Sequence, residues 1–275
     1  MFKSIIHFAY WIDANKLMFP RQVEIYNVHA GIPDNPNSFN ILNISNEPEP
    51  TRMSNKKVLE VASYYNLILT WDEEILKKCS NSKIFYCGMT WIKEESVQEV
   101  IDKKRFEVST ICTAKNTTNN HMMRQKLWNI QYKIKKIPSI FWNSTQSPMP
   151  TIFNNPFLGT YPHEKIQMFF AQYHIAIENS CMNNYFSEKL MDCFMTETIP
   201  IYIGCPNIGK FFNIDGIIVA KNENDIVKIC NSLNTDFYKS KINSIKENKE
   251  LCKEYCKDFT DRIYDAIVSE VTTSI

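Results

Sequence analysis

The residues best suited to chemistry lie in one segment, HIAIENSCMNNYFSEKLMDCFMTETIPIYIGCPNIGKFF, at positions 174–212. An apolar run typical of a buried strand ends there at Asn179, and Ser187, Glu188 and Lys189 stand in the first turn of an amphipathic helical pattern. Backbone N–H groups and the helix dipole favour an anion at such a helix start, and Lys189 adds a full positive charge. The segment therefore predicts a phosphate site, although Glu188 and Lys189 taken alone would equally suit a solvated helical turn.

Tyr185 extends the helical pattern, because Glu188 and Lys189 follow it by three and four residues. Side chains at that spacing share one helical face if the first turn reaches back to Tyr185. We therefore expect the three side chains to face a ligand together. Burial of Tyr185 in an aromatic core is the alternative.

The elements that must position these residues follow from the pattern along the chain. Apolar, β-rich runs alternate with segments of helical period, which is typical of parallel sheets covered by helices. The sequence therefore predicts an α/β fold. Strands are expected at residues 23–28, 39–44, 66–70, 83–87, 106–112, 139–142, 174–178, 200–204 and 216–219, and helices at residues 55–65, 72–79, 122–133, 163–172, 186–196, 223–233 and 238 to about 271.

A charged stretch at residues 93–104 separates the first series of elements from the second. We place the domain boundary there, with one domain at residues 1–100 and the other at residues 101–275. Two Rossmann-like halves imply a cleft between the carboxyl ends of two sheets, which is where open α/β sheets bind ligands.

Composition and motifs exclude several classes of protein. The 275 residues carry 31 Lys plus Arg against 30 Asp plus Glu, a net charge of +1, so no overall field exists to hold a nucleic acid. Neither GxGxxG nor GxxxxGK[ST] occurs, which argues against dinucleotide dehydrogenases and P-loop NTPases. No apolar run approaches the ~20 residues of a membrane-spanning helix. Nine scattered cysteines suit a reducing cytoplasm.

The informative segment resembles a known family in its order of motifs. ENS at 178–180, Tyr185, SEKL at 187–190 and TIPIYIG at 198–204 look like the donor-binding motif of the glycosyltransferase family 10 fucosyltransferases. The resemblance is close over about forty residues and loose over the rest of the second half. It implies a GT-B fold of two Rossmann-like domains facing across a cleft, with the donor held by the second domain and the acceptor by the first.

The resemblance also implies roles for individual residues. Asn179, Tyr185, Glu188 and Lys189 match family positions that contact the nucleotide-sugar donor, and Lys189 would neutralise its diphosphate. The family uses an Arg on the first helix of the second domain for the same phosphates, and HMMRQKLW offers Arg124. Arg124 as a plain surface cation is the alternative, and His121 in the same stretch could touch phosphate or cap the helix.

The family's general base is a Glu in a short, acidic, proline-containing motif of the first domain. NISNEPEPTR follows the strand expected at 39–44, so Glu47 is the first candidate and Glu49 the second, with solvated turn charges as the alternative. In an inverting transfer the acceptor hydroxyl attacks the anomeric carbon as the nucleoside diphosphate leaves. That scheme requires no metal. Asp72 in the WDEE motif is expected to be a helix N-cap rather than a metal ligand.

These observations predict an inverting glycosyltransferase that moves L-fucose from GDP-fucose to a glycan hydroxyl, with no further cofactor. The expected partners are a nucleotide sugar and a glycan acceptor, without nucleic acid. The family members without membrane and stem segments that the chain resembles are bacterial or viral, so we expect the cytoplasm of a bacterium or of a virus-infected host cell. A related glycosyltransferase with another nucleotide sugar, or a non-catalytic module that binds a nucleotide or glycan, are the alternatives.

Overall fold

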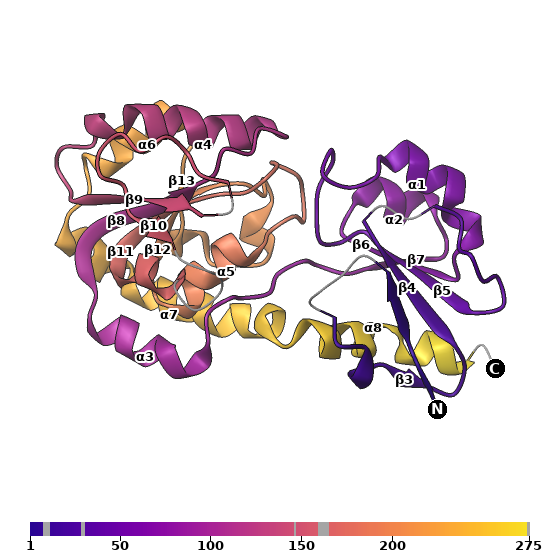
Figure 1. Cartoon of the computed structure of the whole chain (residues 1–275). Helices are drawn as coiled ribbons and strands as arrows, with labels where there is room; N and C mark the ends of the chain where they lie inside the picture. The colour runs from indigo at the N-terminus through magenta and orange to yellow at the C-terminus, as the bar shows by residue number, and fades with distance from the viewer. Residues whose placement is uncertain (8–11, 29–30, 146, 159–164, 274–275) are drawn as a thin grey trace. The chain divides into compact units, whose positions relative to one another are not determined.

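The computed structural model describes residues 1–7, 12–28, 31–145, 147–158 and 165–273 (Figure 1). The contacts within the chain divide it into two compact units. Unit 1 comprises Met1–Met89, Asn183–Tyr185 and Cys256–Ile275, and unit 2 comprises Thr90–Met182 and Phe186–Tyr255.

Unit 1 is built on a parallel sheet whose five strands lie side by side in chain order. Its described residues also form a separate antiparallel pair of strands, three α-helices and two short 3-10 helices at Ala14–Lys16 and Ala62–Tyr64. The strands of the sheet are β2 (Ile5–His7), β4 (Val23–Asn27), β5 (Phe39–Asn43), β6 (Leu67–Thr70) and β7 (Ser82–Ile84), the pair is β1 (Phe2–Lys3) with β3 (Met18–Phe19), and the helices are α1 (Asn55–Val61), α2 (Glu73–Lys78) and α8 (Phe259–Thr273).

Helices cover both faces of the sheet in unit 1. Successive side chains of a strand point to opposite faces, so each strand contributes to both cores. One set of alternate residues packs with α8, and the other packs with α1 and α2. The first core contains Val23, Ile25, Phe39, Ile41, Leu67 and Leu69 with Phe259, Ile263, Ile267 and Val271 of α8, and the second contains Tyr26, Leu42, Ile44 and Ile68 with Val58, Val61 and Ile75 of the two short helices.

Unit 2 holds a parallel sheet of six strands in the order β10-β9-β8-β11-β12-β13. Figure 1 shows α4 and α6 on one face of this sheet and α5 and α7 on the other. The strands are β8 (Arg105–Cys112), β9 (Ser139–Ser144), β10 (Phe157–Leu158), β11 (Ala171–Ile177), β12 (Ile199–Ile203) and β13 (Ile218–Val219), and the helices are α3 (Glu94–Asp102), α4 (Asn119–Ile130), α5 (Glu188–Met195), α6 (Glu223–Cys230) and α7 (Thr235–Cys256).

Numbered along the chain, the strands of unit 2 lie in the order 3-2-1-4-5-6, which is that of the Rossmann fold. The chain runs outward from β8 to β10 and then returns to β11 on the other side of β8. The strand order therefore reverses between β8 and β11. Ligands of such sheets bind beside the carboxyl ends of the strands at this switch point.

The α/β fold predicted from the sequence is confirmed, with several local differences, among them the strands β1, β2 and β3, which precede the first predicted strand. Residues 163–172 were expected to form one helix, but a short 3-10 helix at Lys165–Phe170 leads directly into β11, and His163 lies outside the described residues. Pairing of β11 with β8 and β12 on its two sides outweighs the helical pattern there. The charged stretch at 93–104 contains α3, and β10 lies in a stretch predicted as loop.

The chain also divides at other places than predicted. The first crossing between units falls after Met89 instead of residue 100, and residues 256–275 belong to unit 1. The long helical pattern from 238 to 271 consists of two helices, because Asp258 caps α8 by accepting hydrogen bonds from the backbone N–H groups of Thr260 and Asp261 at 3.0 and 3.1 Å. The apolar stripe of α8 then packs into the core of unit 1.

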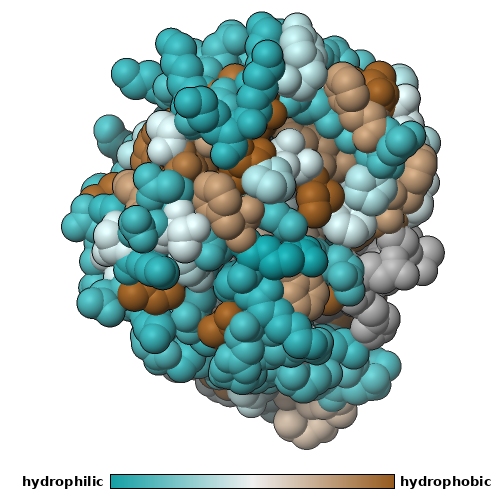
Figure 2. Space-filling view, turned by 90° about the vertical axis from the view of Figure 1, so that its left-hand side faces the viewer, coloured by the Kyte–Doolittle hydropathy of each residue, from teal (hydrophilic) through white to brown (hydrophobic). Residues whose placement is uncertain are grey.

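Within the described residues, no helix has both the length and the apolar character needed to cross a bilayer. On the face that Figure 2 shows, hydrophilic side chains dominate and hydrophobic ones lie in separate small patches. Single exposed apolar residues of this kind are normal for a protein surface.

Candidate functional site

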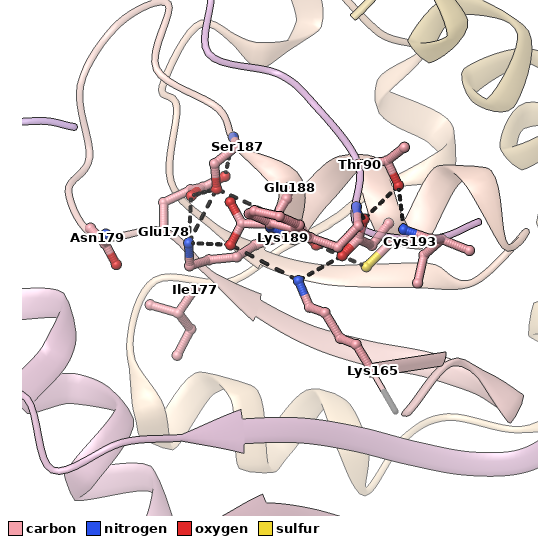
Figure 3. Close-up of polar contacts among 12 residues, drawn as sticks. Thr90, Lys165, Ile177, Glu178, Asn179, Ser187, Glu188, Lys189 and Cys193 are labelled. Atoms are coloured by element: carbon pink, nitrogen blue, oxygen red, sulfur yellow. Dashed lines mark hydrogen bonds and ion pairs between the residues drawn. The ribbon is translucent and has the colours of Figure 1, made fainter. Parts of the chain in front are cut away.

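The centre of the candidate site is the turn that connects β11 to α5 in unit 2. Glu178 follows β11 directly, and its buried carboxylate accepts hydrogen bonds from the backbone N–H of Ser187 at 2.8 Å and from the Ser187 hydroxyl at 2.6 Å (Figure 3). Ser187 in turn caps α5 by accepting a hydrogen bond from the backbone N–H of Lys189. Glu178 thus fixes the start of α5 against the carboxyl end of β11.

Gly204, at the end of the neighbouring strand β12, makes room for this carboxylate. A Cβ atom at Gly204 would lie 2.6 Å from Cγ of Glu178 and would collide with the Tyr202 hydroxyl. That hydroxyl accepts a hydrogen bond from the backbone N–H of Cys205 at 3.0 Å. The glycine of the TIPIYIG motif is therefore needed for close packing around Glu178.

Lys189 and Glu188 are charged neighbours in the first turn of α5. The Lys189 ammonium lies 2.9 Å from Oε1 of Glu188 and 3.9 Å from Oε2 of Glu178. Burial opposes its charge, but these two carboxylates raise the pKa of Lys189 above its ordinary value. Burial likewise opposes ionisation of Glu188, yet Lys189 and Lys165 lower the pKa of Glu188 to about 2. Both side chains therefore stay charged at neutral pH.

A second buried ammonium group, which the sequence did not reveal, belongs to the same cluster. Lys165 lies 2.6 Å from Oδ2 of Asp192 and 4.0 Å from Oε1 of Glu188 (Figure 3). The other oxygen of Asp192 accepts hydrogen bonds from the Thr90 hydroxyl at 2.6 Å and from the backbone N–H of Trp91 at 2.8 Å. Only the fold brings Lys165 to α5, because the two stand more than twenty residues apart in the sequence.

Arg124 and Asn179 meet at the switch point, and their contact with a donor stays a prediction. Arg124 projects from α4, the first helix after β8, and its Nη2 donates a hydrogen bond to Oδ1 of Asn179 at 2.9 Å. Its Nε donates to the carbonyl oxygen of Ile177, the last residue of β11, at 3.1 Å. Arg124 also lowers the pKa of Lys189, although less than the carboxylates raise it, so the two cations act on the same region.

His121 caps α4 and stays neutral. Its Nδ1 accepts a hydrogen bond from the backbone N–H of Thr118 at 3.2 Å, while the Thr118 hydroxyl caps the backbone of His121 in return. Burial, together with Arg124, Lys115 and Lys189, lowers the pKa of His121 to about 4. The capping interpretation of His121 is confirmed, and burial is the main reason for its low pKa, with the neighbouring cations adding to it.

The predicted helical face of Tyr185, Glu188 and Lys189 is wrong. Helix α5 begins at Glu188 after the Ser187 cap, so Tyr185 precedes the helix. Its ring is 1% exposed and packs on Trp71 with ring centroids 5.1 Å apart, both within unit 1. The donor contact of Tyr185 stays a prediction, while its packing as a core aromatic matches the alternative interpretation.

The two candidate bases lie in unit 1 on the loop that follows β5. Oε2 of Glu47 accepts a hydrogen bond from the Thr51 hydroxyl at 3.1 Å. The Glu49 carboxylate accepts one from the backbone N–H of Asn55, at the start of α1, and lies 3.8 Å from Nη1 of Arg52. Both glutamates are half-buried. Both glutamates therefore have hydrogen-bond partners near this loop, and which of them acts as the base stays a prediction.

The loop itself is held by a buried ion pair. Nη2 of Arg52 lies 3.0 Å from Oδ2 of Asp72, and both side chains are almost fully buried. Asp72 caps α2 by accepting hydrogen bonds from the backbone N–H groups of Glu74 and Ile75, which confirms its predicted role. The described residues contain no group of three or more His, Cys, Asp or Glu side chains that could hold a metal ion.

What the arrangement in unit 2 can do chemically is to hold an anion. A guanidinium, an ammonium and the capped start of an eight-residue helix lie around the carboxyl end of β11. Guanidinium and ammonium groups bind phosphate oxygens well. The backbone N–H groups of Ser187 and Lys189 already donate to Glu178 and to the Ser187 hydroxyl, so the two cations are the main anion-binding groups here. Together with the strand-order reversal, this favours a phosphate-containing ligand at the switch point.

Comparison with known proteins identifies the fold. No family profile and no curated protein matches the sequence. An α1,3-fucosyltransferase with GDP-fucose is 15% identical and aligns over 90% of this chain and 80% of its own length, with a TM-score of 0.53. HepE of Anabaena in complex with UDP and glucose is 9% identical over 92% of this chain and 78% of its own, with a TM-score of 0.56.

A third structure extends the same likeness. A UDP-forming α,α-trehalose-phosphate synthase from Burkholderia vietnamiensis is 7% identical over 94% of this chain and 73% of its own, with a TM-score of 0.56. At such identities the likeness concerns the fold alone. The chain therefore has the GT-B fold with two Rossmann-like domains, as the resemblance predicted, while the ligand-binding cleft between them stays a prediction.

Proposed function

We propose that this protein is a glycosyltransferase that binds a nucleotide sugar in unit 2 and transfers the sugar to a glycan hydroxyl. The observation that carries the proposal is the grouping of Arg124, Asn179 and Lys189 around the carboxyl end of β11, at the point where the strand order reverses. This group of residues lies in a fold that solved glycosyltransferases share.

In the proposed reaction the acceptor oxygen forms a bond to the anomeric carbon as the bond to the nucleoside diphosphate breaks, with inversion. The acceptor proton passes to the Glu47 carboxylate, with Glu49 as second candidate. Negative charge that develops on the departing diphosphate is stabilised by Arg124 and Lys189. Asn179 and Glu188 hold the rest of the donor, and no step requires a metal.

GDP-fucose is the first candidate donor, because the ENS, Tyr185, SEKL and TIPIYIG motifs resemble those of fucosyltransferases. The solved structures of similar fold include an α1,3-fucosyltransferase with GDP-fucose and HepE with UDP and glucose. UDP-glucose is therefore the main competing donor to test.

The test has two stages. Thermal shift with GDP, UDP, GDP-fucose, GDP-mannose and UDP-glucose identifies the donor, because a ligand at 100 times its Kd adds about 2.7 kcal/mol to the free energy of unfolding. Incubation of the stabilising nucleotide sugar with a panel of glycans should then release the nucleoside diphosphate. Lys189→Met serves as the binding-deficient control.

We expect stabilisation by one nucleotide and its sugar, and loss of that stabilisation in Lys189→Met. Stabilisation by none of the five compounds would refute the proposed function. Stabilisation without release of nucleoside diphosphate with any glycan would support the non-catalytic binding module instead.

A further inference from the structure

The charge cluster on α5 contains a lysine that has no place in the proposed donor contacts. We propose that Lys165 is a positioning residue of the donor site, which offsets the carboxylates of Asp192 and Glu188 so that Lys189 can bind the donor diphosphate. This inference rests on the proposed function.

The contacts of Lys165 place it within the cluster. Its side chain is 8% exposed, and its ammonium lies 2.6 Å from the fully buried carboxylate of Asp192. It is also 4.0 Å from the same Glu188 oxygen that lies 2.9 Å from the Lys189 ammonium. Figure 3 shows the Glu188 carboxylate between the two ammonium groups. Lys165 and Lys189 therefore compete for one carboxylate.

The number of charged groups shows why a second cation is needed. The cluster combines three carboxyl groups, those of Glu178, Glu188 and Asp192, with the ammonium groups of Lys165 and Lys189. Without Lys165, Lys189 would be the one ammonium group of this cluster to offset three carboxyl groups. A diphosphate would then have to approach uncompensated carboxylates in a buried region, where charges interact more strongly than in water.

Asp192 cannot turn its charge away from the cluster. One of its oxygens is held by the Thr90 hydroxyl and by the backbone N–H of Trp91, at 2.6 and 2.8 Å. The other oxygen is thereby directed at Lys165. Burial raises the pKa of Asp192 above its ordinary value, and the nearby Lys165 ammonium opposes this shift. The geometry thus assigns Lys165 a balancing charge and no direct contact with the donor.

The experiment uses the full chain and a ligand series of graded charge. Dissociation constants are measured by calorimetry for guanosine, GMP and GDP, and for uridine, UMP and UDP, with wild type, Lys165→Met, Lys165→Arg and Asp192→Asn. Measurements at pH 8 limit proton uptake by a carboxyl that has lost its partner. The Asn variant retains an oxygen that can accept the hydrogen bonds from Thr90 and Trp91.

We expect Lys165→Met to weaken binding of the nucleoside diphosphate about tenfold, the monophosphate less, and the nucleoside not at all. Lys165→Arg should bind like wild type, and Asp192→Asn should bind the diphosphate more tightly than wild type. This last result separates a balancing charge from a merely structural ion pair, whose loss would weaken all ligands alike.

If wild type binds a nucleotide, two results would overturn the inference about Lys165 and leave the proposed function intact. Equal losses for nucleoside and diphosphate in Lys165→Met would show a structural role, and unchanged diphosphate binding would show no role. If wild type binds no member of either series, the proposed function fails and the inference fails with it. Thermal melts identify any variant that does not fold. If Lys165→Met does not fold, the diphosphate affinity of Asp192→Asn decides whether Lys165 acts as a balancing charge.

Discussion

The Arg124 guanidinium donates a hydrogen bond to the side-chain oxygen of Asn179 at 2.9 Å and thereby joins α4 to the turn that follows β11. Because Nε also donates to the Ile177 carbonyl, the plane of the guanidinium is held in one orientation at the end of the strand. A planar cation in a fixed orientation suits the paired oxygens of a phosphate better than a flexible one.

Arg124→Met should lower kcat/KM for the donor by about 10²-fold, because it removes a preorganised charge from the departing diphosphate. Arg124→Lys should recover only part of the loss, since an ammonium keeps the charge and not the planar group. Steady-state kinetics with varied donor measures both. Lys126→Met is the matched control, because Lys126 is exposed on the same helix. Equal effects of Arg124→Met and Lys126→Met would contradict a specific role for Arg124.

Glu47→Gln should leave donor affinity near that of wild type while transfer falls about 10²- to 10⁴-fold, since the amide cannot accept the acceptor proton. Calorimetry measures donor affinity, and release of nucleoside diphosphate measures transfer. Glu49→Gln is the control, with an expected loss of stability because Glu49 accepts a hydrogen bond at the start of α1 and lies near Arg52. If Glu49→Gln abolishes transfer and Glu47→Gln does not, Glu49 is the base.

His121 should make the protein less stable as the pH falls. Its pKa is about 4 in the folded state, against about 6.5 in an unfolded chain, so between these values only the unfolded state takes up the proton. The free energy of unfolding should therefore fall between pH 6.5 and pH 4, by at most about 3 kcal/mol.

His121→Gln removes this contribution, and its amide oxygen can still accept the capping hydrogen bond from Thr118. Urea unfolding of both proteins at several pH values gives the difference, in which contributions from other groups cancel. Parallel pH profiles for wild type and His121→Gln would show that His121 titrates alike in the folded and unfolded states.

Gly204→Ala should destabilise unit 2 by about 1 to 3 kcal/mol, because the added methyl group would overlap Glu178 and Tyr202. Gly209→Ala is the matched control, since a Cβ there has no neighbouring atom within 4 Å. Thermal melts compare the two variants. Similar melting temperatures for both would mean that the packing around Glu178 yields easily, and donor affinity of Gly204→Ala would then be expected to stay at the wild-type level.

Much of the fold followed from local pattern. The strand at Ile199–Ile203 reads IPIYI, a continuous apolar run of the kind that predicts a buried parallel strand. The strands at Val23–Asn27 and Phe39–Asn43 mix apolar with polar residues, and the structure buries both kinds. The motif around α5 could also be predicted, because strand, turn, cap and cation follow each other within a few residues. Arg124 needed the family resemblance, since nothing local distinguishes it from a surface cation.

The remaining features depend on contacts between distant parts of the chain. Lys165 becomes part of the site only because β11 returns beside β8 and carries it to α5. Tyr185 was placed on a helix because its spacing fits, but Ser187 caps α5 two residues later and Trp71 accommodates the ring. Neither the position of a cap nor the partner of an aromatic ring can be predicted from spacing alone.

The placement of α8 has a consequence for biosynthesis. The first eighty-nine residues emerge from the ribosome before the helix that covers one side of their sheet, and residues 90–255 must be translated in between. At about 5 to 20 residues per second this interval lasts roughly 10 to 30 s. During that time the nascent sheet would present Val23, Ile25 and Ile41 to solvent and to chaperones. A stop codon after residue 255 would make this exposure permanent and should drive the product into aggregates or proteolysis.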